Sequence, residues 1–64
     1  MNELDCVKLV KPFKGLKIGT KGCVVAKHSE TDYDVEFVDD NGNTLDVYTI
    51  SNDFLEVYWI SKTL

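Results

Sequence analysis

The chain has 64 residues, a formal net charge of −4 and a hydrophobic content of 44%. A chain of this length supports one small domain, which buries roughly 60% of the surface that its unfolded form exposes. The apolar content is close to that of globular proteins, which argues against disorder. We therefore expect a single domain over residues 1–64, with little room for an enclosed active site beside the core.

Membrane and export signals are weak in this sequence. No apolar run approaches the roughly 18 residues that a membrane span requires. The chain begins MNELD, which includes two acids, whereas a signal peptide begins with basic residues and an apolar stretch. These features predict a cytoplasmic protein that has no membrane partner.

The two cysteines are not expected to hold a metal or a disulfide. In a reducing cytoplasm, Cys6 and Cys23 should be free thiols that act as small core residues. Zinc prefers four ligands, and the only further nitrogen ligand is His28. The sequence therefore predicts no metal site and no cofactor.

Charge is distributed unevenly along the chain. Six of the seven lysines lie between residues 8 and 27, and arginine is absent. Residues 29–60 carry nine acids and no lysine or arginine. The acids are Glu30, Asp32, Asp34, Glu36, Asp39, Asp40, Asp46, Asp53 and Glu56. This pattern fits either a solvated surface that keeps a small protein soluble or an acidic face that attracts a basic partner.

The N-terminal third predicts two strands separated by a long loop. Residues 4–10 form the first expected strand, with Leu4, Cys6 and Leu9 facing inward. Residues 11–20 contain the only proline and two glycines, which indicates a loop. The second expected strand covers residues 21–28, where a glycine permits a close approach or a sharp bend.

The third strand has the clearest pattern in the chain. Over residues 33–38, Tyr33, Val35 and Phe37 alternate with two acids, as in a half-buried antiparallel strand. The Asn-Gly pair that follows favours a type I′ hairpin turn, because both residues tolerate positive φ.

The C-terminal third predicts two more strands and a short turn. Residues 44–50 are rich in strand-forming side chains, and residues 51–53 resemble a 3₁₀ turn. The last expected strand, residues 54–61, is apolar on both faces except at Glu56. Together the pattern predicts an all-β fold: five antiparallel strands in a small SH3-like barrel that is closed or nearly closed.

Three stretches carry a further signal: LKIGTKGCVV at residues 16–25, YDVEFVD at residues 33–39 and GNTL at residues 42–45. Together they resemble an uncharacterised bacterial family that is known only as a domain of unknown function. The resemblance covers nearly the whole chain and implies an SH3-like barrel, in a family some of whose members are encoded beside toxins or mobile cassettes. It implies no catalytic residue. Ala26 and Lys27 depart from its pattern, which leaves the facing of the second strand open.

Catalytic and phosphate-binding patterns are poorly matched. Nucleophilic catalysis needs a nucleophile, a base and an orienting group, yet the chain has one histidine, His28. The spacing of Gly15, Gly19 and Gly22 matches no phosphate-binding loop. A calcium-loop pattern begins at Asp39 but fails afterwards, because Thr44 stands where a glycine is needed and Ile50 where a glutamate is needed. We expect no enzymatic activity.

The aromatic end of the chain offers a second candidate surface. A small barrel cannot bury both faces of the last strand unless the N-terminal segment or the loop at 11–20 covers one of them. An uncovered face would expose Tyr58 or Trp59, and such residues commonly anchor protein interfaces, including those of homodimers.

These features support three hypotheses of function. The first is an immunity-like or antitoxin-like protein that masks a basic toxin with carboxylates. The second is an accessory subunit that docks on a larger protein through its aromatic strand. The third, which the acids disfavour, is nucleic-acid binding through the lysines. The candidate partner-binding residues are Asp34, Glu36, Asp46, Tyr48, Glu56, Tyr58 and Trp59.

Overall fold

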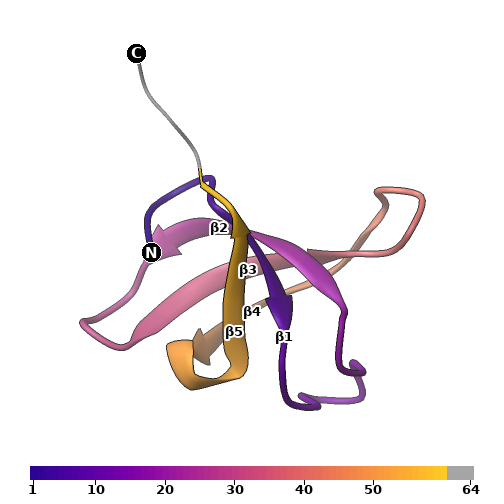
Figure 1. Cartoon of the computed structure of the whole chain (residues 1–64), viewed down its shortest axis with the longest axis horizontal. Helices are drawn as coiled ribbons and strands as arrows, with labels where there is room; N and C mark the ends of the chain where they lie inside the picture. Colours follow the sequence, from indigo (N-terminus) through magenta and orange to yellow (C-terminus); the bar gives the residue numbers. More distant parts are fainter. Residues whose placement is uncertain (61–64) are drawn as a thin grey trace.

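A computed structural model describes residues 1–60 and contains one antiparallel sheet of five strands (Figure 1). The strands are β1 (Cys6–Leu9), β2 (Lys21–Lys27), β3 (Asp32–Val38), β4 (Thr44–Ser51) and β5 (Leu55–Trp59). A 3₁₀ helix, η1 (Asn52–Phe54), joins β4 to β5. The expected all-β fold with five strands is thereby confirmed; the last residue of the strand predicted over 54–61 lies outside the described residues.

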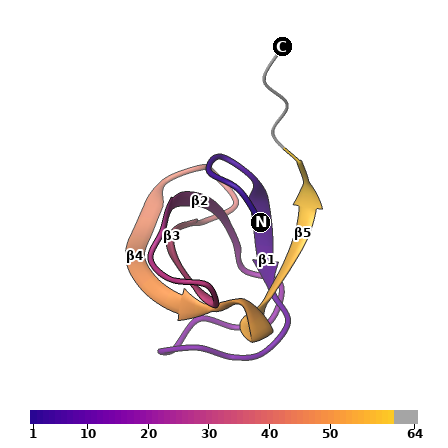
Figure 2. The same cartoon turned by 90° about the vertical axis from the view of Figure 1, so that its left-hand side faces the viewer.

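The sheet curls into an open barrel. Its strand order is β4-β3-β2-β1-β5, so β4 and β5 are the two terminal strands. Figure 2 shows them on opposite sides of the barrel, connected at one end through η1. This order, with a 3₁₀ turn before the last strand, gives a small SH3-like fold whose barrel stays open between β4 and β5.

The core lies on the inner, concave face of the sheet, and every strand contributes to it. Its fully or nearly fully buried residues are Val7, Leu9, Val24, Tyr33, Val35, Phe37, Ile50 and Leu55. The alternation predicted for residues 33–38 is confirmed, because every second residue of β3 is buried. Burial of these apolar side chains is the main stabilising contribution in a domain of this size.

The facing predicted for the first strand is wrong at two positions. Leu9 is buried as expected, but Val7 accompanies it, while Leu4 is 64% exposed and Cys6 is only half-buried on the outer face. Side chains alternate along a strand, so residues 6 and 9 cannot share a face. Leu4 precedes β1 and has a positive φ of 69°.

The second strand bends near Ala26, where the sequence did not determine which side chains face the core. Gly22 and Val24 are buried, and the pairing with β3 shifts between Val24 and Ala26. Such a bulge bends a strand and increases its twist. Gly22 confirms the predicted close approach, since a Cβ there would lie 2.8 Å from the Glu36 carbonyl oxygen.

The turn between β3 and β4 is not of type I′. The Gly42 N–H donates to the Asp39 carbonyl over 3.0 Å, so Asp40 and Asn41 are the central residues, and neither has positive φ. Gly42 follows with a φ of 83°. A type I turn followed by a left-handed glycine is the usual arrangement of such three-residue loops, and here the glycine takes the only left-handed position.

The loop between β1 and β2 packs against β4 and η1. The Phe13 ring meets Tyr48 of β4 and Phe54 of η1 edge-on, with centroid distances of 5.6 and 5.4 Å. The loop does not cover the outer side of β5, because Tyr58 and Trp59 are 46% and 55% exposed. The aromatic end of the chain is therefore an uncovered surface of the described chain.

Candidate protein-binding surface

The fold separates charge into two neighbouring hairpins. Residues 32–51, which comprise β3, its turn and β4, form the acidic hairpin, with six acids and no base. Residues 6–27, which comprise β1, the long loop and β2, form the basic hairpin, with six lysines and no acid. Strands β2 and β3 pair, so the two hairpins lie side by side. Because β4 is a terminal strand, the acidic hairpin forms one end of the sheet, with three acids on β3, two in the turn and one on β4.

Two carboxylates of the acidic hairpin stand together on the outer face of β3. Asp34 accepts a hydrogen bond from the Thr49 hydroxyl of β4, and Glu36 accepts one from the Thr44 hydroxyl. The Nδ1 atom of His28 lies 3.9 Å from the Asp34 carboxylate. Each carboxylate is thus oriented by one neutral donor and keeps acceptor capacity for cationic donors from a partner.

Asp46 and Tyr48 belong to the same hairpin but to the other face of the sheet. They lie opposite Phe37 and Val35, which are core residues. The Tyr48 ring is half-buried, 6.4 Å from the Phe37 ring. Partial desolvation, and then the Asp46 carboxylate, raise the pKa of Tyr48. Tyr48 therefore acts mainly in packing, and the predicted acids do not form a single face.

The three remaining predicted residues lie on β5, at the far edge of the sheet. Glu56 is opposite Lys8 of β1. The Lys21 ammonium lies 5.5 Å from the centre of the Tyr58 ring, and burial followed by the nearby Cys6 thiol raises the pKa of Tyr58. Figure 2 shows β5 opposite β4. The aromatic edge, which we define as Tyr58 and Trp59, is thus separate from the carboxylates of β3.

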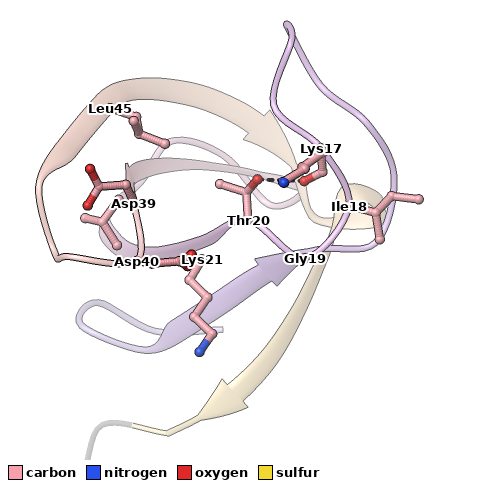
Figure 3. Close-up of a pocket in the computed structure, with 9 residues that line it drawn as sticks. Lys17, Ile18, Gly19, Thr20, Lys21, Asp39, Asp40 and Leu45 are labelled. Atoms are coloured by element: carbon pink, nitrogen blue, oxygen red, sulfur yellow. Dashed lines mark hydrogen bonds between the residues drawn. The ribbon is translucent and has the colours of Figure 1, made fainter.

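A groove that the sequence did not reveal lies between the loop and the turn of the acidic hairpin (Figure 3). Its volume is about 250 Å³, and lysines 17 and 21 and acids 39 and 40 line it together with apolar side chains. The Asp39 carboxylate accepts hydrogen bonds from the backbone N–H groups of Asn41 and Asn43, each over 2.9 Å. These bonds lower the pKa of Asp39. The Asp39 carboxylate therefore orders the turn that forms one wall of the groove.

The two cysteines face each other on the outer side of the sheet. Cys6 and Cys23 are directly opposite in the β1–β2 ladder, with their sulfur atoms 3.9 Å apart. Both are free thiols and both are half-buried, so the predicted role as core residues is wrong. Burial and the adjacent Cys6 thiol raise the pKa of Cys23. The sequence did not predict this pair, because the proximity of the two thiols depends on the register between β1 and β2.

Within residues 1–60, no group of three or more His, Cys, Asp or Glu side chains could hold a metal ion. None of the described helical segments is long and apolar enough to cross a membrane.

The fold and these surfaces define a small SH3-like protein with an acidic hairpin at one edge of its sheet. The chain belongs to DUF4926, a domain of unknown function, whose family model matches residues 3–57. This confirms the expected membership of a family known only as a domain of unknown function. Comparisons with curated proteins and with solved structures gave no match.

Proposed function

We propose that this chain is a non-catalytic, protein-binding module of the bacterial cytoplasm whose acidic hairpin binds a basic protein. The observation that carries the proposal is the concentration of six acids, without a base, in the hairpin that ends the sheet. The partner is a basic toxin, which the module masks by covering its cationic surface.

Asp34 and Glu36 are the centre of the proposed interface. Their hydroxyl partners hold them on one face of β3, so less side-chain freedom is lost when a partner binds. Two carboxylates held side by side carry the same charge as two successive phosphates of a nucleic acid. They can therefore mimic the phosphates that a basic nuclease binds. Surface carboxylates also accelerate encounter with a cationic partner, and this acceleration decreases with salt.

The second candidate is an accessory module that docks through the aromatic edge. It is favoured by the exposure of Tyr58 and Trp59, since such residues are common interface anchors. The same edge is where a homodimer would form. Because β4 and β5 are at opposite ends of the sheet, substitutions can test the two candidates separately.

The partner for the test is a basic, toxin-like chain encoded by a neighbouring open reading frame or, where no such frame is found, a basic protein captured by pull-down and identified by mass spectrometry. Association is followed by stopped-flow mixing at several salt concentrations, with wild type, D34N/E36Q and Y58S/W59S. We expect the association rate of the wild type to fall by about tenfold or more between low and high salt. D34N/E36Q should associate about tenfold more slowly at low salt, and Y58S/W59S should associate as the wild type does. Circular dichroism checks that each variant is folded before its association rate is compared with that of the wild type.

An association rate that does not change with salt would contradict the electrostatic proposal. Binding that survives D34N/E36Q and is lost in Y58S/W59S would assign the interface to the aromatic edge. Gel filtration of the free chain then shows whether that edge pairs with a second copy.

A further inference from the structure

The sheet places Cys6 and Cys23 in a backbone geometry that suits a disulfide. Along the β1–β2 ladder, the Val24 N–H donates to the Asp5 carbonyl over 3.0 Å, and the Leu9 N–H donates to Thr20 over 2.9 Å. Hydrogen-bonded and non-hydrogen-bonded pairs alternate in an antiparallel ladder. The cysteines therefore form a non-hydrogen-bonded pair, in which Cα atoms are about 4.5 Å apart. Disulfides span Cα separations of about 4.4–6.8 Å.

The sulfur atoms are also close and accessible. They are 3.9 Å apart, so rotations about the Cα–Cβ bonds are enough to reach the bond length of about 2 Å. Both side chains lie on the outer face and are half-buried rather than enclosed. A small reagent can therefore reach this pair without unfolding the sheet.

We propose that Cys6 and Cys23 are a redox modification site, forming a reversible cross-strand disulfide by exchange with a low-molecular-weight disulfide such as oxidised glutathione. One cysteine thiolate attacks a sulfur of the oxidant and releases a glutathione thiolate. The second cysteine thiolate then attacks the cysteine sulfur of the mixed disulfide and releases the other glutathione. The cysteines lose two electrons and two protons, and the glutathione sulfurs gain them.

The bond would close the basic hairpin at its base. It would join β1 to β2 on either side of the long loop, which carries three of the lysines of the basic hairpin. A crosslink of this kind constrains the unfolded chain and stabilises the folded one. The oxidised form would therefore be the more stable form of the same fold.

The experiment is a redox titration of the full chain with reduced and oxidised glutathione, in buffer and again in concentrated urea. Mass spectrometry follows the loss of two hydrogens. The fluorescence of Trp59, the only tryptophan and the ladder neighbour of Cys6, provides a second readout. We expect the equilibrium constant for disulfide formation to be at least about tenfold larger in buffer than in urea. The folding equilibrium constant of the oxidised form should exceed that of the reduced form by the same factor, because the two ratios close one thermodynamic cycle.

The single variants C6S and C23S are the matched controls, and each should stop at the mixed disulfide. Equal equilibrium constants in buffer and in urea would show that the fold does not favour the bond, and would overturn the proposal. A wild-type product that remains a mixed disulfide, or that is an intermolecular dimer, would overturn it as well. Neither measurement depends on a binding partner.

Discussion

The two hairpins contribute side chains to the same core but carry opposite charges outside it. The basic hairpin contributes Val7 and Leu9 to the core, and the acidic hairpin contributes Val35 and Phe37. Outside the core, the basic hairpin carries six lysines and the acidic hairpin carries six acids. The inner face thus requires the same kind of side chain from both, whereas the outer face leaves charge free to vary. The core therefore does not require the difference in charge between the hairpins, and this difference is what the proposed function would use.

The largest effect is expected when a core side chain is removed from either hairpin. Phe37 is fully buried and Leu9 nearly so, and F37A should cost about 3–5 kcal/mol and L9A about 2–5 kcal/mol. A domain of this size has only about that much stability, so both variants should be largely unfolded. Urea denaturation followed by circular dichroism measures this loss.

The exposed outer residue Val47 supplies the control for those variants. V47T keeps a branched side chain on β4 and should change the free energy of unfolding by less than about 0.5 kcal/mol. If F37A lowered the free energy of unfolding by less than about 1 kcal/mol, burial in the common core would not be what stabilises the two hairpins.

The next largest effect is expected where the two hairpins touch. A Cβ at Gly22 of β2 would lie 2.8 Å from both the Glu36 carbonyl oxygen and a Val35 methyl group. Backbone cannot rotate away, so G22A should force the strands apart and cost about 1–3 kcal/mol. Thermal unfolding measures this cost, and K27A, at the exposed end of the same strand, is the control. A G22A variant as stable as K27A would indicate that β2 and β3 tolerate a wider separation.

The sequence predicted most of the architecture because local patterns determine it. Residues 33–38 alternate without interruption, so their facing was evident. At the first strand, the apolar residues at 4, 7 and 9 did not indicate a unique facing, because Leu4 precedes the strand. The Asn-Gly pair suggested the wrong turn type, since the Asp39 carboxylate holds the backbone N–H groups of Asn41 and Asn43 instead.

The candidate surface was less predictable than the fold because it depends on strand order. Along the chain, Glu56 follows the acids of β3 and β4. In the sheet, β5 pairs with β1, which places Glu56 beside Lys8 and removes it from those acids. The approach of the two thiols likewise depends on pairing between distant segments. The local periodicity of a sequence does not indicate which distant strands pair.

A third prediction concerns the turn of the acidic hairpin and pH. Hydrogen bonds from the backbone N–H groups of Asn43 and Asn41 lower the pKa of Asp39 from its ordinary value of 3.8. The unfolded chain therefore binds this proton more tightly than the folded chain does. The stabilisation is fully present above the ordinary pKa and is lost as the pH falls through the lower folded value.

Replacing Asp39 by Asn should therefore lower the melting temperature at pH 7, and the gap to wild type should shrink toward pH 3. D40N, which alters the adjacent exposed acid, is the control and should show a smaller gap at pH 7. A gap for D39N that stays constant from pH 7 to pH 3 would show that the charge of Asp39 does not stabilise the turn.

The smallest effect is expected on the outer face of the acidic hairpin. T49V removes the hydroxyl that donates to Asp34 but keeps a branched side chain suited to a strand. Because the bond is exposed to water, which can replace the lost donor, the free energy of unfolding should change by less than about 0.5 kcal/mol. Urea denaturation checks this against wild type. A loss above about 1 kcal/mol would mean that polar contacts on the outer face help to hold β4 on β3. The carboxylates would then be constrained by folding as well as by binding, and the opposite charges of the two hairpins could not be assigned to function alone.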